Sequence, residues 1–228
     1  MGEHVTFRSN GDQAQGYLAL PAAGSGPGVV LIQEWWGLVD HVRDVADRLA
    51  GEGFVVLAPD LFRGENTTEP DDAMRLMMGL AMGRAARDIA GAASYLAGRE
   101  EVAGGIGAVG FCMGGSLALW SATLSDDIRA AVGFYPAVPW ERMEPTWPRY
   151  DGKAAQIHNS EEDGGPDAES MRVARESIEA AGGEVTVHGY PGTSHAFFND
   201  QRPEVYSAEA SGLAWARTVE FLRQRLSA

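Results

Sequence analysis

The chain has 228 residues, of which 45% are hydrophobic and 22% are charged, a composition with enough apolar residues for a globular core. Its 18 basic and 32 acidic residues give a formal net charge of −14 at pH 7, so we expect neither nucleic acid nor a membrane surface as a partner. One cysteine excludes a disulfide within the chain. The first ten residues lack the features of a signal peptide, and no apolar run has transmembrane length, so we expect a cytoplasmic protein.

The predicted elements alternate between strand and helix after an N-terminal hairpin. Alternating residues around Asn10-Gly11-Asp12 predict the hairpin, continuous apolar runs predict buried parallel strands, and periodic apolar segments predict helices. In chain order, the elements expected after the hairpin are strand 28–33, helix 40–50, strand 54–58, helices 71–80 and 84–97, a strand–turn–helix at 105–120, strand 128–135, an ordered loop at 137–151, strand 153–158, helix 166–181, strand 184–188 and helix 207–226. This order predicts an α/β fold in one domain, residues 1–228, with a mostly parallel sheet covered on both faces.

The strand–turn–helix at residues 105–120 contains the cysteine. Residues 105–111 are apolar, and Cys112 lies within Gly-Phe-Cys-Met-Gly-Gly. This is the layout of a nucleophile elbow, in which glycines let the strand and the helix approach closely. Because the start of a helix favours a thiolate, the pattern predicts that Cys112 is a nucleophile. The alternative is a buried cysteine that packs as a small hydrophobic residue.

Acidic residues and a histidine follow the later strands in the chain order of an α/β-hydrolase triad. An acidic loop comes after strand 153–158, and His195 comes after the last predicted strand. Since chain order differs between the known triad folds, this order favours His195 as the base and Asp163 as the carboxylate that orients it. The neighbouring acidic residues that remain alternatives to Asp163 are Glu161, Glu162 and Asp167.

Two further functional groups are expected where strand 28–33 ends. Glu34 follows this buried strand, and a carboxylate there is costly unless it is paired or protonated. We expect it to hold the Cys112 S–H in a neutral pair until a substrate displaces it, the alternative being a structural ion pair. The backbone N–H groups of Met113 and Trp35 are expected to form an oxyanion hole.

Five motifs together resemble the dienelactone hydrolase family, from about residue 3 to the C-terminus. Two of them are specific as a pair, namely Gln33-Glu34-Trp35-Trp36-Gly37 and Gly110-Phe111-Cys112-Met113-Gly114-Gly115. The others are Pro59-Asp60-Leu61-Phe62, His158 with Asp163 five residues later, and Ser194-His195-Ala196-Phe197. The resemblance implies an α/β-hydrolase fold, no metal or organic cofactor, and a monomer or homodimer.

The resemblance also implies a reaction. In the family, an enol-lactone is opened by acyl transfer to the cysteine thiolate, and the acyl-enzyme is then hydrolysed. Carried over to this chain, it implies a triad of Cys112, His195 and Asp163, with Glu34 activating Cys112 when substrate arrives.

The substrate is expected to differ from an anionic dienelactone. The family has arginines that bind the substrate carboxylate, one of them a few residues after the catalytic histidine. Here Arg202 is the first arginine after His195, and Arg75 is the candidate for the other. Aromatic side chains and a methionine-rich segment at 71–82 instead predict a more apolar ester or lactone. The side chains expected to contact it are Trp36, Tyr135 and Phe197.

The predicted function is hydrolysis of small lactones or esters through a thioacyl-enzyme. One alternative is a thioesterase or acyltransferase on the same fold. Another is a non-catalytic, redox-sensing protein in which Cys112 is oxidised reversibly.

Overall fold

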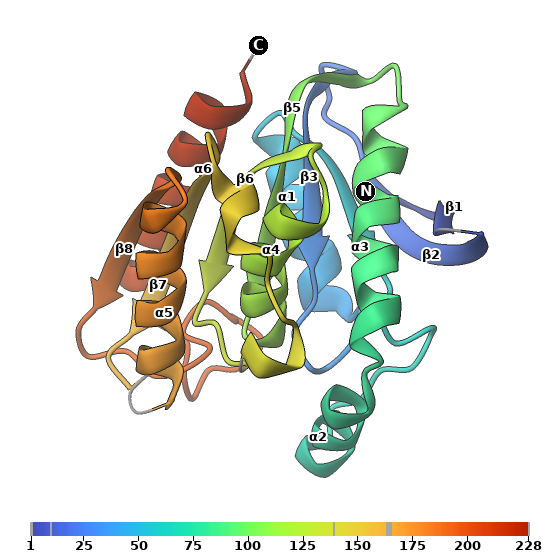
Figure 1. Cartoon of the computed structure of the whole chain (residues 1–228). Helices are drawn as coiled ribbons and strands as arrows, with labels where there is room; N and C mark the ends of the chain where they lie inside the picture. Colours follow the sequence, from blue (N-terminus) through green and yellow to red (C-terminus); the bar gives the residue numbers. More distant parts are fainter. Residues whose placement is uncertain (1, 10, 139, 163–165, 228) are drawn as a thin grey trace.

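A computed structural model describes residues 2–9, 11–138, 140–162 and 166–227. Within these residues, eight strands form one sheet in the order β1-β2-β4-β3-β5-β6-β7-β8 (Figure 1). The strands are β1 (Glu3–Ser9), β2 (Asp12–Ala19), β3 (Gly26–Ile32), β4 (Val55–Pro59), β5 (Val102–Phe111), β6 (Ile128–Phe134), β7 (Ala154–Ser160) and β8 (Glu184–Tyr190). The helices are α1 (Asp40–Gly51), α2 (Pro70–Gly79), α3 (Met82–Ala97), α4 (Met113–Leu124), α5 (Pro166–Ala180) and α6 (Ala208–Leu226).

The pairing of the strands confirms the predicted α/β architecture. β1 and β2 are antiparallel, with Ser9 opposite Asp12, and β2 is also antiparallel to β4. The pairs from β4 through β3, β5, β6 and β7 to β8 are all parallel. The carboxyl ends of these six strands therefore meet at one edge, which is where ligands bind in open α/β sheets.

The central strands are buried because helices cover both of their faces. Residues 29–32 of β3 and 106–111 of β5 are almost completely inaccessible to solvent. α1 and α6 cover one face, while α3, α4 and α5 cover the other (Figure 1). A strand covered on both faces needs apolar side chains in both directions, which is why these strands are continuous apolar runs.

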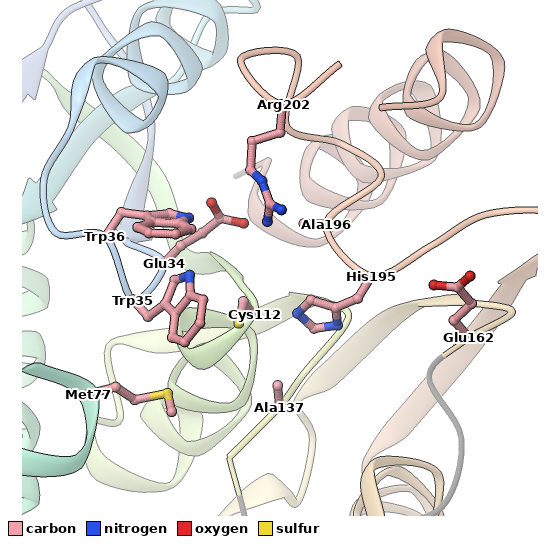
Figure 2. Close-up of a pocket in the computed structure, with 10 residues that line it drawn as sticks. All are labelled: Glu34, Trp35, Trp36, Met77, Cys112, Ala137, Glu162, His195, Ala196 and Arg202. Atoms are coloured by element: carbon pink, nitrogen blue, oxygen red, sulfur yellow. The ribbon is translucent and has the colours of Figure 1, made fainter. Parts of the chain in front are cut away.

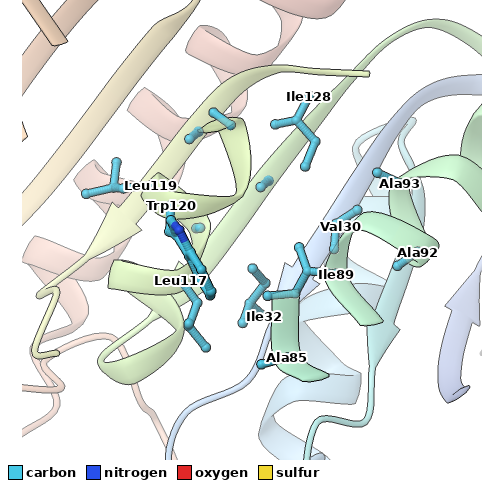
Figure 3. Close-up of a cluster of buried hydrophobic side chains, with 14 of the residues drawn as sticks. Val30, Ile32, Ala85, Ile89, Ala92, Ala93, Leu117, Leu119, Trp120 and Ile128 are labelled. Atoms are coloured by element: carbon cyan, nitrogen blue, oxygen red, sulfur yellow. The ribbon is translucent and has the colours of Figure 1, made fainter. Parts of the chain in front are cut away.

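The α3/α4 face of the sheet has a closely packed core. Figure 3 shows Ile89 of α3 and Leu117 and Trp120 of α4 over Val30 and Ile32 of β3. The small side chains of α3, several of them alanines, let the helix lie close to the sheet. This packing fixes the start of α4 relative to the ends of β3 and β5, and so fixes the position of Cys112.

The structure differs from the predicted elements mainly at their ends. Most boundaries move by one to three residues, which is the usual uncertainty of helix and strand ends. The predicted ordered loop at 137–151 contains two short 3-10 helices, η1 (Trp140–Arg142) and η2 (Trp147–Tyr150). In the described ranges, the helices are too short or too polar to cross a membrane.

Candidate active site

Cys112 lies in a sharp turn between β5 and α4. Its backbone has φ 54° and ψ −119°, a conformation that side-chain-bearing residues rarely adopt. Backbone hydrogen bonds hold it there, because the Cys112 N–H donates to the Phe134 carbonyl (2.9 Å) and the Cys112 carbonyl accepts from the Gly115 N–H (2.9 Å). The turn presents the thiol at the carboxyl end of the central strand, as the elbow pattern predicts.

The glycines around Cys112 allow this close approach of helix and strands. A Cβ atom on Gly114 would overlap the backbone carbonyls of Ile32 and Gln33, and a Cβ atom on Gly110 would overlap the Gly114 carbonyl. Glycine is therefore required at both positions by backbone contacts.

Cys112 opens into a cavity of about 370 Å³ at the carboxyl ends of the strands. Figure 2 shows the His195 ring on one side of Cys112, with Trp35 and Trp36 on the other side. The other lining residues are Glu34, Met77, Ala137, Glu162, Ala196 and Arg202. The cavity thus combines a thiol, an imidazole, two carboxylates and a guanidinium within a partly aromatic lining.

His195 is placed by the loop that follows β8. Its ring makes an edge-on contact with the Tyr135 ring, with centroids 4.9 Å apart. The neighbouring Ala196 has φ 67°, and Tyr135, directly after β6, has φ 37°. Two strained backbone positions therefore support the histidine beside Cys112.

The acidic loop after β7 lies on the far side of His195 from Cys112. Asp163, the predicted orienting carboxylate, is outside the described residues. Of the alternatives, Glu162 is exposed and lines the cavity, as Figure 2 shows, and Glu161 accepts a hydrogen bond from the Gly192 N–H (2.6 Å). Asp167 is in the first turn of α5. Glu162 thus lies on the side of His195 that faces away from Cys112 (Figure 2).

Glu34 is buried, with 2% of its surface exposed, and yet lines the cavity. Each carboxylate oxygen has a donor: Asn199 Nδ2 donates to Oε2 (2.9 Å), and the Tyr135 hydroxyl donates to Oε1 (3.4 Å). The Asn199 Oδ1 accepts from the Gln201 N–H (3.1 Å), which turns its NH₂ group toward Glu34. Two neutral donors therefore compensate the burial of this carboxylate.

Asn199 is a site residue that the sequence reasoning missed. It is 3% exposed and lies four residues after His195, in a stretch without an arginine. A polar residue within an aromatic stretch just after the histidine is the signal that could have identified it.

Arg202 reaches the cavity although it follows His195 by seven residues. Its guanidinium lies over the Trp36 ring, 5.8 Å from the centroid, and its Nε donates to Glu204 (2.9 Å). Arg75 is exposed, pairs with Asp72 (3.5 Å) and is not among the cavity-lining residues. The cavity is thus less apolar than the sequence predicts.

Of the other residues predicted for the site, some line the cavity and some lie behind its lining. Trp35 and Trp36 line the cavity, whereas Tyr135 and Phe197 have no exposed surface and lie behind the lining. Met113 is the first residue of α4, where backbone N–H groups have no acceptor within the helix. The methionine-rich helix α2 contributes Met77 to the lining.

The mostly parallel sheet, the elbow at the end of its central strand and the histidine after the last strand define the class of protein as an α/β-hydrolase. Residues 14–226 match the dienelactone hydrolase family, and the chain belongs to this family of ester and lactone hydrolases.

Known proteins of similar sequence or similar structure align with almost the whole length of the chain. It is 32% identical to "Protein usf" of Aquifex pyrophilus, with both chains fully covered. It is 30% identical to a "Putative carboxymethylenebutenolidase" of Aquifex aeolicus, over 99% of this chain and 100% of that one. The crystal structure of a "Putative Dienelactone Hydrolase" from Klebsiella pneumoniae has a TM-score of 0.85 at 23% identity, covering 98% of each chain. That last likeness shows the fold.

Proposed function

We propose that this protein hydrolyses small esters or lactones through a thioacyl-enzyme on Cys112. The observation that carries the proposal is the strained backbone of Cys112, at φ 54° and ψ −119°, within a cavity that His195 also lines. Strained backbone conformations cluster at functional sites, where they position a reacting group. A cysteine that only packs in the core does not require such a conformation.

In the proposed first step, the Cys112 thiol gives its proton to His195, and the resulting thiolate attacks the carbonyl carbon of the substrate. The oxyanion that forms is stabilised by the backbone N–H groups of Trp35 and Met113. His195 transfers a proton to the departing alkoxide, which leaves as an alcohol or, in a lactone, stays attached to the acyl group. In the second step, His195 takes a proton from water, which hydrolyses the thioester and restores the thiol.

The two carboxylates have separate roles in the proposal. Asp163 orients the imidazole of His195 and stabilises its protonated form. Glu34 lines the same cavity as Cys112 and is the nearby group that modulates its protonation. Since Asn199 and Tyr135 donate to Glu34, the carboxylate is held at the end of β3 when no ligand is bound.

The test is hydrolysis of p-nitrophenyl acetate, with and without iodoacetamide treatment, followed by intact mass measurement. The expected result is turnover that is lost in proportion to a single added carbamidomethyl group, which can only be on Cys112 because the chain has one cysteine. Turnover that persists in fully modified protein would overturn the nucleophile assignment. If the protein is not modified, the iodoacetamide treatment is repeated in the presence of substrate. If Cys112 still does not react, the result would contradict an accessible thiolate.

A further inference from the structure

A second cavity of about 260 Å³ adjoins the one that contains Cys112. We call it the side chamber, and its lining includes Trp36, His41, Thr67, Thr68, Gln201 and Arg202. Trp36 and Arg202 line both cavities and stack on one another, so they form the wall between them. At about 30 Å³ per water, the side chamber has the volume of roughly nine water molecules.

His41 is a buried polar group that faces the side chamber. It is 1% exposed and lies at the start of α1, between the rings of Phe111 and Phe198. Its Nδ1 is 3.4 Å from a carboxylate oxygen of Asp200, yet neither ring nitrogen makes a hydrogen bond within the described residues. A buried imidazole without hydrogen bonds is unfavourable. Both ring nitrogens are closed off from solvent, so the chamber wall has to shift slightly before a ligand hydroxyl can supply a partner.

The charges around the side chamber favour an uncharged ligand. Glu204 binds Arg202 at 2.9 Å, so this guanidinium already has a carboxylate partner, and Asp200 places a second carboxylate beside His41. The rest of the polar lining consists of the hydroxyl groups of Thr67 and Thr68 and the amides of Asn199 and Gln201. Hydroxyl and amide groups both donate and accept hydrogen bonds, as a ligand hydroxyl does.

The side chamber adjoins the first cavity on the acyl side of the reacting bond. The leaving group has to lie beside His195, which donates a proton to it. Trp36 lies on the opposite side of Cys112 from His195 (Figure 2), and it also lines the side chamber. A group that reaches the chamber from the thioester on Cys112 therefore belongs to the acyl part.

We propose that the side chamber binds the remote end of the acyl group, and that this end is uncharged and carries hydroxyl groups. The inference rests on the proposed ester hydrolysis at Cys112. It assigns the substrate class as esters or lactones of hydroxylated acids.

The test compares three methyl esters of equal chain length that differ only at the far end: methyl hexanoate, methyl 6-hydroxyhexanoate and monomethyl adipate. Hydrolysis is followed by titration of the acid released, and kcat/KM is measured for each. We expect the hydroxylated ester to be preferred over methyl hexanoate by about two- to tenfold, the range for a neutral hydrogen bond, and the adipate to be poorer than the hydroxylated ester.

Three variants test whether the preference arises in the side chamber. Thr68→Val keeps the shape of the side chain without its hydroxyl, Thr68→Ser keeps the hydroxyl, and His41→Leu removes both ring nitrogens. Because the ratio of two substrates on one enzyme does not depend on the fraction of folded protein, the ratio of hydroxylated to plain ester is the readout. The ratio should fall toward one in Thr68→Val and His41→Leu and stay near the parent value in Thr68→Ser.

Three results would overturn the inference while the proposed function stands: a ratio near one in the parent enzyme, an unchanged ratio in both Thr68→Val and His41→Leu, or a preference for the adipate. The last would identify the chamber as an anion site. No turnover of any methyl ester or of p-nitrophenyl acetate would instead overturn the proposed function, and the inference with it.

Discussion

Cys112 has a thiol at a position where the elbow pattern usually has a serine, and the two groups are not equivalent. A serine hydroxyl is far less acidic than a thiol, so it is harder to activate in the cavity that Glu34 and His195 line. We expect Cys112→Ser to lower kcat/KM for p-nitrophenyl acetate by roughly a hundredfold or more. Cys112→Ala provides the background rate. A serine variant within twofold of the parent would contradict the thiolate mechanism.

The contribution of the Asn199 side chain to stability should come mainly from its hydrogen bond to Glu34. Replacing Asn199 by Leu leaves one oxygen of a buried carboxylate without its donor, which costs about 1–3 kcal/mol. In a Glu34→Gln background the same replacement should cost clearly less, because no buried charge is left unsatisfied. Urea unfolding of the four proteins measures both costs. Equal costs in the two backgrounds would mean that Asn199 acts through its other contacts.

Chain order alone predicted that Cys112, Glu34 and His195 belong to one site. Each of them follows a strand, and the carboxyl ends of parallel strands converge, so their proximity needs no knowledge of the loops. The positions of Asn199 and Arg202 depend on the path of the loop after His195, which tertiary packing decides. The same is true of Tyr135 and Phe197, which turn inward behind the cavity. The role of Asp163 stays a prediction.

The close approach of α4 to β3 depends on glycine at position 114. Alanine at Gly114 would bring a Cβ atom into the carbonyls of Ile32 and Gln33, which are backbone atoms of a buried segment. We expect Gly114→Ala to lower the free energy of unfolding by about 1–3 kcal/mol, the usual cost of overpacking.

The matched control for Gly114→Ala is Gly212→Ala in α6. Nothing lies within 4 Å of a Cβ atom at Gly212, so the better helix propensity of alanine should stabilise the protein by up to about 1 kcal/mol. Thermal and urea unfolding of both variants test the contrast. Similar effects at the two positions would show that helix propensity, and not contact with β3, decides the result at Gly114.

The existence and type of the main helices and strands followed from apolar runs and periodicity, because burial on both faces of a sheet leaves a clear pattern. The short helices η1 and η2 had no such pattern. They lie in a segment rich in proline and tryptophan, and Tyr150 is fixed there by donating its hydroxyl hydrogen to the Leu119 carbonyl (2.6 Å). A contact with a helix thirty residues away cannot be predicted from local sequence.

At the scale of the whole molecule, a buried polar network joins β7, β8 and α6. His158 Nδ1 is hydrogen-bonded to the Tyr190 hydroxyl (2.7 Å), and its Nε2 is within reach of Gln156 (3.1 Å) and Thr218 (3.0 Å). Burial, together with the nearby His188 and Arg217, lowers the pKa of His158 well below 6.5. The folded protein therefore holds this imidazole neutral where the unfolded chain would protonate it.

This pKa difference makes stability depend on pH. Above about pH 6.5 the imidazole is neutral in both states, so its contribution to stability is fully present. As the pH falls below that value, the unfolded chain binds a proton that the folded protein does not, and stability is lost. His158→Gln should therefore be less stable than the parent at pH 8, and this deficit should shrink by up to about 2 kcal/mol at pH 5. Urea unfolding at the two pH values measures it, and a deficit independent of pH would refute the assignment.

The general arrangement of the molecule was predictable, since alternating strands and helices indicate a mostly parallel sheet with two covered faces. The order of the strands was not. β3 lies between β4 and β5, and β2 pairs with β4, which depends on how the crossovers pack and not on the pattern of any one segment.

Cys112, Tyr135 and Ala196 share one feature: each has a positive φ without being glycine. A screen that rewards resistance to heat would favour glycine at Cys112 and Ala196, since it relieves the strain. At Tyr135 the loss of a fully buried aromatic side chain would outweigh that relief. Glycine would remove the thiol at Cys112 and the constraint next to His195 at Ala196. Selection for thermal stability and selection for catalytic rate would therefore favour different residues at positions around the same cavity.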